Sequence, residues 1–415
     1  MTNSIALAEV AALLKPGMTV FVAGTGGESL LFVEMLKEHP EACAGVRFAG
    51  VLIPGVNHTD YAGLHETARS TAFFITPANR GSHAAGKVDF LPMHYSAVTP
   101  YLREHMNIDL ALIQVAPARN GAHSVGIAAD FVPSIVDVAK TVVAHVNPAM
   151  PAPPDCPALP ASGIDYVVEA EHALLEYDLG KIPNKLNDLG NNIASLIGDG
   201  DCIEVGLGKI QAAVLGPLHD RKNLRLHAGM ISDPIMDLYA AGAFAARTNG
   251  RAPITTGVAV GSPELYAFVG ENPDIAFRSV THTHDIGVLG AIDNFVAINS
   301  AIEVDLLGQG NAEMIAGKQV SAGGGLVDFM RGARRSAGGR AVLALISATP
   351  DGKTSRIVPA FAPGTVVTCG RTDIDFVVTE NGVADLRNTT PHARAEALIG
   401  VAAPQFREEL DASLK

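Results

Sequence analysis

The amino-acid sequence predicts an α/β protein made of two related, open and mostly parallel domains. Short apolar runs rich in β-forming residues alternate with helical patterns along the chain, which is typical of parallel sheets. At 415 residues the chain is too long for one ordinary core and suits two domains of roughly 200 residues each. Both halves also contain the same order of strand, glycine turn and helix, beginning at Gly17 and at Gly200. We place the domains at residues 1–180 and 181–415.

In the first half, a helical pattern opens the chain and an apolar strand begins after Gly17. Further strands and helices alternate up to a stretch at 147–162 that is dense in proline, which forbids both helix and central strand. We expect this stretch to be an extended connection near the domain boundary. The predicted strands are 19–23, 46–52, 110–115 and 141–146, and the predicted helices are 5–14, 30–37 and 135–140.

In the second half, the segment from Gly200 repeats the pattern that begins at Gly17, and each segment is followed by a second strand. In related open domains of this kind, ligands bind at the carboxyl ends of the strands, so we expect the active site in a cleft between those ends. The predicted strands are 202–205, 224–226, 295–299, 341–346 and 365–368, and the predicted helices are 186–197, 391–401 and 405–413.

Composition excludes several classes of function. A formal net charge of −13 without a basic run argues against a nucleic-acid surface, although a few local cations or N–H groups suffice for an anionic ligand. No apolar stretch reaches about 18 residues, and the first 15 residues lack the basic start and apolar run of a signal peptide. The four cysteines are scattered without metal-ligand spacing. We expect reduced thiols, a cytoplasmic location and no metal.

Two glycine-rich segments are expected to bring the backbone close to a ligand or to another group. Gly206, Leu207, Gly208 and Lys209 close a strand and open a helix, so backbone N–H groups there can hold a phosphate or a thioester oxyanion. A dinucleotide site requires a third glycine, and Gln211 stands there instead. In the second segment, Gly323, Gly324 and Gly325 run into an apolar, strand-like stretch, which indicates close approach of the backbone to another group.

Several longer motifs resemble one protein family. Residues 297–309 (AINSAIEVDLLGQ) are similar to the family block INSAIEVDLTGQ, and residues 321–329 (SAGGGLVDF) are similar to SGIGGQVDF. Residues 227–233 (HAGMISD) resemble a motif that reads His-Thr-Glu-Met. The chain is thereby identified as a member of the acetyl-CoA hydrolase/transferase family, which includes 4-hydroxybutyrate and butyrate–acetate CoA transferases. Further matches follow in order at 205–210, 261–266, 355–359, 377–384 and 403–410, with looser ones at 24–29, 89–94 and 147–151.

The resemblance implies a fold of the CoA transferase type and a covalent mechanism. A glutamate attacks the acyl-CoA, takes CoA as a thioester and passes it to a second carboxylic acid. The family's oxyanion and CoA loop falls on residues 206–209, and its glycine-rich CoA loop falls on residues 323–325. Gln211 replaces a loop proline, and Leu326 replaces a glutamine. The glutamate itself falls on Gly229, which has no side chain.

Three explanations of Gly229 are open. Another carboxylate has taken over, for which Glu28 after the Gly24–Gly27 turn is the candidate. Alternatively, water replaces the carboxylate in a thioesterase or lyase, with His227, His58 or His94 as the base. Thirdly, the chain binds acyl-CoA or a partner subunit without catalysis.

Other polar patterns receive structural interpretations. His282 and His284 have the spacing of a metal pair, but no further ligands lie nearby in the sequence. Glu303 and Asp305 share a strand face, and we expect them to fix its surroundings. We therefore predict an acyl-CoA-handling enzyme, formally a CoA transferase acting on small carboxylic acids. We expect no cofactor besides the CoA thioester substrate, no nucleic-acid or membrane partner, and a homo-oligomer.

Overall fold

The computed structural model describes residues 3–414 and divides into two compact units. The first unit contains the chain up to Asp178 together with Thr255–Thr283 and Val320–Gly324, and the second contains Leu179–Ile254, His284–Gln319 and the chain from Gly325 onward. The first unit therefore takes segments from both predicted domains, whereas the second lies almost entirely within residues 181–415. The predicted boundary between residues 180 and 181 stays a prediction.

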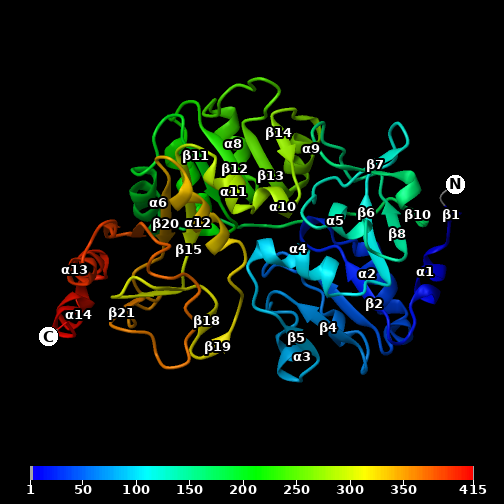
Figure 1. The fold of residues 1–415 in the computed structure, drawn as a ribbon, viewed down its shortest axis with the longest axis horizontal. Coiled ribbons are helices and arrows are strands. Elements are labelled where there is room, and N and C mark those ends of the chain that lie inside the picture. Colours follow the sequence, from blue (N-terminus) through cyan, green and yellow to red (C-terminus); the bar gives the residue numbers. More distant parts are fainter. Residues whose placement is uncertain (1–2, 415) are drawn as a thin grey trace. The chain divides into compact units, whose positions relative to one another are not determined.

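The first unit is built on a sheet in which every recorded strand pair is parallel (Figure 1). Leu110–Val115 is buried along its whole length, as expected for a central strand covered on both faces. The strands run in the order β1 (Asn3–Ser4), β10 (Tyr166–Glu169), β8 (Val142–Val146), β6 (Leu110–Val115), β2 (Thr19–Val22), β3 (Arg47–Gly50), β4 (Arg69–Ala72) and β5 (Val88–Phe90).

Helices and a small hairpin complete the first unit. The hairpin pairs β7 (Ala122–Ser124) with β9 (Ala158–Pro160) in antiparallel fashion. Strands β13 (Ile254–Ala259) and β14 (Ile275–Phe277) are neighbours and lie, apart from Ile254, in the segment Thr255–Thr283. The helices are α1 (Leu7–Leu13), α2 (Leu30–Glu38), α3 (Arg80–Ala84), α4 (Tyr95–Glu104), α5 (Val132–Val136), α9 (Pro263–Glu271) and α10 (Val280–Thr283).

The second unit repeats this arrangement. Its strands run in the order β12 (Arg225–Ile231), β11 (Cys202–Val205), β15 (Phe295–Ser300), β20 (Arg340–Ala344), β22 (Phe376–Thr379) and β23 (Gly382–Asp385), with β23 antiparallel to β22. The order β12, β11, β15, β20, β22 matches β3, β2, β6, β8, β10 of the first unit. The predicted α/β class and the predicted similarity of the two opening segments are confirmed.

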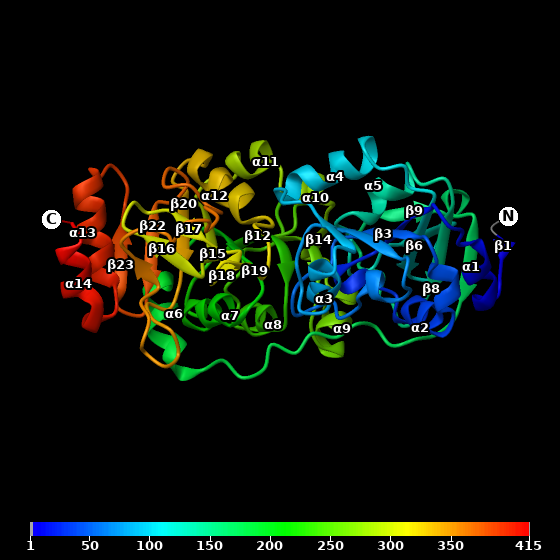
Figure 2. The same ribbon diagram turned by 90° about the horizontal axis from the view of Figure 1, so that it is seen from below.

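The remaining elements of the second unit are short strands and the helices around its sheet. Figure 2 shows α13 and α14 beside β23. The short strands are β16 (Glu303–Asp305), β17 (Gly310–Asn311), β18 (Met314–Ile315), β19 (Lys318–Gln319) and β21 (Ile357–Val358). The helices are α6 (Asn187–Ala194), α7 (Lys209–Leu215), α8 (Pro234–Ala240), α11 (Ile286–Gly290), α12 (Leu326–Arg335), α13 (Pro391–Val401) and α14 (Arg407–Ala412).

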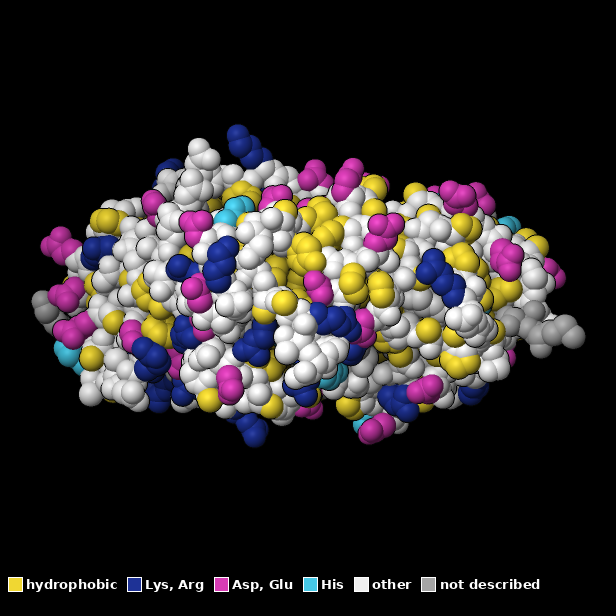
Figure 3. All heavy atoms as spheres, turned by 90° about the horizontal axis from the view of Figure 1, so that it is seen from above, with side chains coloured by type: hydrophobic (Ala, Val, Ile, Leu, Met, Phe, Trp, Pro, Cys, Tyr) yellow, Lys and Arg dark blue, Asp and Glu magenta, His cyan; other side chains and the backbone are white. Residues whose placement is uncertain are grey.

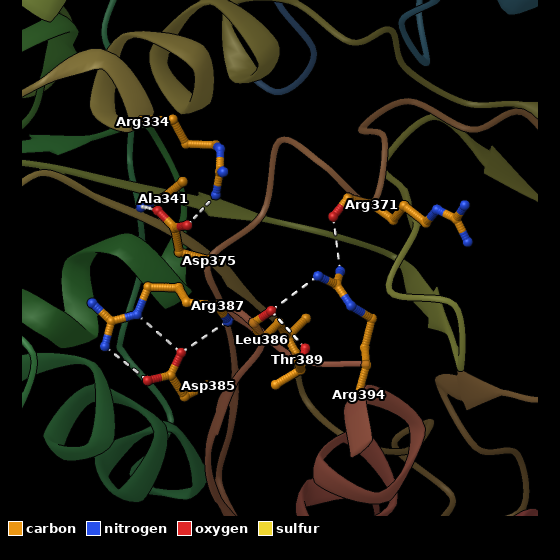
Figure 4. A network of polar contacts seen from close by, with 9 residues as sticks. All are labelled: Arg334, Ala341, Arg371, Asp375, Asp385, Leu386, Arg387, Thr389 and Arg394. Carbon is orange, nitrogen blue, oxygen red and sulfur yellow. Dashed lines mark hydrogen bonds and ion pairs between the residues drawn. The ribbon is translucent and has the colours of Figure 1, made fainter. Parts of the chain in front are cut away.

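A polar network around Asp375 joins α12, β20 and β22 in the second unit (Figure 4). The buried carboxylate of Asp375 pairs with the Arg334 guanidinium and accepts a hydrogen bond from the Ala341 N–H at 3.0 Å. Nearby, Arg387 and Asp385 form an exposed ion pair at 2.7 Å. The network fixes helix α12 against the strand ends at one side of the sheet.

Several sequence predictions are corrected by the structure. Residues 365–368 form no strand, and the proline-rich stretch 147–162 lies inside the first unit and contains β9. The stretch after the three glycines is helix α12 because its buried residues Leu326, Met330 and Ala333 recur at helical spacing. The helix expected at 135–140 spans Val132–Val136 because a proline fits its first turn.

Charged side chains of both signs are interspersed on the face drawn in Figure 3. Among residues 3–414, no helix is long and apolar enough to cross a membrane. All four cysteines are unbridged thiols, three of them buried.

Candidate functional site

The turn after β11 in the second unit has the backbone geometry that the sequence predicted. Gly208 adopts φ +122°, which favours glycine, and helix α7 begins at the next residue, Lys209. A Cβ atom on Gly206 would meet no heavy atom within 4 Å. Gln211, which stands in place of the family's proline, donates a hydrogen bond to the Ser300 hydroxyl at 3.1 Å. The turn therefore leaves open space beside Gly206 while its helix is tied to β15.

A small hollow lies at this turn and at the carboxyl end of β12. Most of the residues that line it have apolar side chains, and the Gln211 amide and the Ser232 hydroxyl are its polar side-chain groups. It is lined by Val205, Gly206, Gln211, Ala212, Leu215, Met230, Ile231, Ser232 and Ile235. Within the second unit, this is the space that the predicted oxyanion turn faces.

The space beside Gly229 is filled by an imidazole. Gly229 lies within β12, and a Cβ atom there would stand 2.8 Å from Cε1 and 3.0 Å from Nε2 of His284. The same ring faces Gly325, where a Cβ atom would stand 2.5 Å from Nε2. Phe329 packs on the imidazole with ring centroids 4.5 Å apart. A glutamate at position 229 would therefore collide with His284.

Burial controls the charge state of the His284 imidazole. His284 is 4% exposed, and burial together with the nearby His227 lowers its pKa to about 3. His227, a predicted base, is itself buried and points to the same side of β12 as Gly229, with Phe295 at its edge. His282 and His284 do not converge on one site, because His282 is exposed whereas His284 is buried. Among residues 3–414, no group of three metal-binding side chains occurs.

The carboxylate of Glu204, on β11, lies close to the glycine turn at residues 206–209. Its side chain accepts hydrogen bonds from the Ile298 N–H at 3.2 Å and the Asn299 amide at 2.8 Å. Burial raises the pKa of Glu204 to about 8. No motif marks Glu204 in the sequence, and the one signal for it is a single carboxylate inside an apolar strand.

The glycine-rich loop divides between the two units after Gly324. Within the first unit, Gly324 adopts φ +54°, and a Cβ atom there would stand 3.0 Å from the Phe74 ring. The Gly324 carbonyl accepts a hydrogen bond from the Tyr95 N–H at 3.0 Å. Glycine is thus required at position 324 by backbone conformation and by packing. A substitution there therefore tests the fold as well as ligand binding.

Glu28, the predicted substitute nucleophile, lies in a buried network of the first unit. Glu28 is 1% exposed, and its carboxylate accepts hydrogen bonds from the Asn57 amide and the Tyr61 hydroxyl, both at 2.9 Å. Asn57 also accepts a hydrogen bond from the N–H of Thr25, which adopts φ +52°. Such strain in a non-glycine residue is found at functional sites. Both donors hold the Glu28 carboxylate under the Gly24–Gly27 turn.

Asp130 belongs to the same region and was not predicted. Its carboxylate lies 3.4 Å from the hydroxyls of both Thr25 and Tyr95, and burial raises its pKa to about 6. Tyr95 thereby joins Asp130 to the backbone of Gly324. No sequence motif marked Asp130, because its partners come from distant segments of the chain.

The other predicted residues have simpler surroundings. His58 and His94 are exposed in the first unit, and Lys209 is exposed in the second. Glu303 and Asp305 accept hydrogen bonds from Asn311 and Gln309, in agreement with a structural role. Within the first unit, Glu28 and His58 are not in contact through any recorded hydrogen bond, and His227 belongs to the second unit.

Comparisons with known proteins show which family this chain resembles. Residues 3–176 match the acetyl-CoA hydrolase/transferase N-terminal domain, and residues 261–414 match the acetyl-CoA hydrolase/transferase C-terminal domain. The chain is 38% identical to the 4-hydroxybutyrate coenzyme A transferase of Clostridium kluyveri over 94% of this chain and 92% of that protein.

Two solved structures are similar over nearly the whole chain. A 4-hydroxybutyrate CoA-transferase from Porphyromonas gingivalis is 30% identical with a TM-score of 0.80, covering 99% of this chain and 97% of that one. RipA from Yersinia pestis is 26% identical with a TM-score of 0.90, covering 99% and 96%.

Proposed function

The chain belongs to the acetyl-CoA hydrolase/transferase family, and from this premise we propose that it transfers CoA between an acyl-CoA and a small carboxylic acid. Members of this family are enzymes. The observation that carries the proposal is the likeness to a 4-hydroxybutyrate coenzyme A transferase along 94% of the chain. The CoA thioester is the substrate, and we propose no separate cofactor. A cytoplasmic location and a homo-oligomer complete the proposal, and light scattering of the purified chain tests the latter.

We assign thioester binding to the backbone of residues 206–209 and of residues 323–325. The open space beside Gly206 and the left-handed Gly208 support the first assignment, since N–H groups at such a turn stabilise an oxyanion. Residue 324 adopts a conformation that favours glycine, which supports the assignment of residues 323–325. The roles of Glu28, His58 and His227 are proposals of the same kind, with Glu28 as a nucleophile and the histidines as bases.

Hydrolysis of the acyl-CoA is the second candidate function, and Gly229 favours it. A glutamyl thioester cannot form at a residue without a side chain, so water can take the place of the attacking carboxylate. Binding of acyl-CoA without catalysis is the third candidate.

The test is CoA exchange together with mass spectrometry of the intact protein. The chain is incubated with a short acyl-CoA, with and without an isotopically labelled carboxylate. Transfer predicts labelled acyl-CoA, whereas hydrolysis predicts free CoA even without the carboxylate. An enzyme–CoA adduct that is lost in Glu28→Gln would identify Glu28 as the nucleophile. Measurable acyl-CoA affinity with neither product would contradict both enzymatic proposals and leave the binding role.

A matched pair of variants tests the glycine turn. Gly206→Ala adds a methyl group in open space, so the fold should be unchanged, and Gly216→Ala does the same at the other end of α7. If the turn approaches the thioester, Gly206→Ala should weaken acyl-CoA binding about 10-fold or more, because contact with the backbone requires glycine. Calorimetry measures the two affinities. Equal affinities for both variants would remove the turn from the site.

A further inference from the structure

Two polar side-chain atoms at the hollow beside Gly206 have no hydrogen-bonding partner among residues 3–414. Gln211 is 6% exposed and donates its amide N–H to the Ser300 hydroxyl at 3.1 Å, but its carbonyl oxygen Oε1 accepts no hydrogen bond. The hydroxyl of Ser232, which is partly exposed, also has no partner. Because polar atoms of nearly buried side chains are normally paired, both atoms are available to a group that enters the hollow.

The size of the hollow limits what can enter it. There is room for one group about the size of a water molecule. The wall opposite the polar atoms is apolar and almost fully buried, and it includes Leu215 of α7 and Ile235 of α8. Gly206, Met230 and Ser232 are partly exposed, so the hollow opens beside the glycine turn. A short chain held at that turn can therefore place one small group inside.

The charges around the hollow decide which small group fits. None of the described residues that line it is Lys, Arg or His. Lys209 is exposed, and a Cβ atom on Gly180 would stand 3.6 Å from its Nζ atom, so this ammonium group lies at Gly180. The residue after Ser232 is the acidic Asp233. A carboxylate in the hollow would therefore be buried without a cation, which is unfavourable.

A hydroxyl group matches the two polar atoms. It can donate a hydrogen bond to Oε1 of Gln211 and accept one from the hydroxyl of Ser232. A methyl group in the same place would leave Oε1 without a donor and shield it from water, which is also unfavourable.

We propose that Gln211 and Ser232 are specificity-determining residues that select an acyl group bearing a hydroxyl. The thioester carbonyl lies at residues 206–209 in this arrangement, and the hydroxyl of the acyl chain enters the hollow. The inference rests on the proposed function, which assigns thioester binding to that turn, and it holds whichever group attacks the thioester. The family motif does not supply it, because proline stands there in place of Gln211 and has no polar side-chain atom.

The test compares acyl-CoAs of equal chain length in the exchange reaction. Butyryl-CoA is measured beside its 2-, 3- and 4-hydroxy forms, and succinyl-CoA supplies a carboxylate at the end of the chain. For the wild type we expect kcat/KM of at least one hydroxy form to exceed that of butyryl-CoA about 10-fold, which corresponds to one or two hydrogen bonds. Succinyl-CoA should be the poorest substrate.

Two variants locate the origin of this preference. Ser232→Ala removes the hydroxyl, and Gln211→Met removes Oε1 at similar volume. Each should lower the kcat/KM ratio of the preferred hydroxy form to butyryl-CoA about 3-fold or more. A loss of folded protein affects both substrates equally and leaves this ratio unchanged. The control is Ser195→Ala at the exposed end of α6, which should keep the wild-type ratio.

The outcomes separate this inference from the proposed function. A wild type that exchanges CoA but does not prefer any hydroxy form to butyryl-CoA would overturn the inference and leave CoA transfer standing. A preference that survives in both variants would also overturn it. If Ser232→Ala fails to fold, Gln211→Met decides. A wild type without exchange for any of these acyl-CoAs would overturn the proposed function, and calorimetric affinities for the same acyl-CoAs would then decide whether the hollow selects a hydroxyl.

Discussion

Buried ionisable side chains dominate the site at the scale of single residues. Glu204 and His284 have shifted pKa values in the second unit, and Asp130 has one in the first. Desolvation is the main cause in all three, and in each case it favours the neutral form. Perturbed groups of this kind are concentrated at functional sites, although they also occur in structural networks.

Glu204 should make stability depend on pH. Its folded pKa of about 8 lies above the unfolded value of 4.5, so its stabilising effect is complete below pH 4.5 and is lost as the pH rises through 8. Glu204→Gln keeps the oxygen that accepts both hydrogen bonds and removes the charge. The unfolding free energy of the variant should equal that of the wild type near pH 4. Near pH 9 it should exceed the wild-type value by roughly a few kcal/mol. Urea unfolding across this range measures the difference, and parallel curves for the two proteins would refute it.

Gly229→Glu should fail to create a family nucleophile on its own. The new Cβ atom would stand 2.8 Å from His284, and such overpacking costs about 1–3 kcal/mol of unfolding free energy. Adding His284→Asn makes room for the glutamate. The double variant should then accumulate a hydroxylamine-sensitive enzyme–CoA thioester, which intact mass detects. If the single variant is as stable as the wild type and forms the thioester, His284 does not block the position.

At the scale of elements, helix α12 connects the glycine-rich loop to the sheet of the second unit. It begins at Leu326 directly after the loop, and its far end is held by the Arg334–Asp375 pair. Close packing against α11 occurs at Gly332, where a Cβ atom would stand 2.4 Å from the Leu289 Cβ atom. The loop's last glycine is therefore joined through α12 to contacts made about two to two and a half turns away.

Asp375→Ala should destabilise the second unit more than Asp385→Ala. The first change leaves the buried Ala341 N–H without its acceptor and costs about 1–3 kcal/mol. The second removes an ion pair whose side chains are about half exposed, which is worth about 0–1 kcal/mol. Denaturant unfolding of both variants gives the comparison. Equal losses would show that the buried carboxylate does not anchor α12.

Sequence reasoning succeeded for elements whose pattern is local. Strand β6 and helix α13 follow from an apolar run and from a proline after a capping threonine, and the structure has both at the predicted residues. The sequence pattern gave wrong predictions where contacts between residues distant in sequence determine the structure. The stretch after the three glycines is apolar and resembles a strand, yet it forms helix α12, and the contacts of His284 with Gly229 and Gly325 join residues that are distant in sequence.

At the scale of the whole molecule, the first unit depends on chain that is far away in sequence. Residues 255–283 and 320–324 belong to it although they follow the opening of the second unit. They make backbone hydrogen bonds with the N-terminal segment, namely Ala129 N–H to Gly257 O at 2.8 Å, Ala259 N–H to Ile127 O at 2.8 Å, Phe277 N–H to Asp155 O at 2.7 Å and Tyr95 N–H to Gly324 O at 3.0 Å.

A fragment that ends at Asp178 should therefore not reach the native fold of the first unit. The strand partners and apolar contacts supplied by residues 255–283 are missing from it, and the backbone groups listed above lose their partners. Circular dichroism and proteolysis of the purified fragment measure this. A cooperative thermal transition and resistance to protease in the fragment would contradict the expectation.

The same interleaving has a consequence for how the chain is made. Ribosomes add about 5–20 residues per second, so the N-terminal segment waits on the order of ten seconds for residue 324 after residue 178 has been joined. During that interval the backbone groups that later pair with residues 257, 259, 277 and 324 lack these partners and are exposed to other nascent chains. Protein yield in the cell should then depend on chaperones that shield the incomplete unit during synthesis.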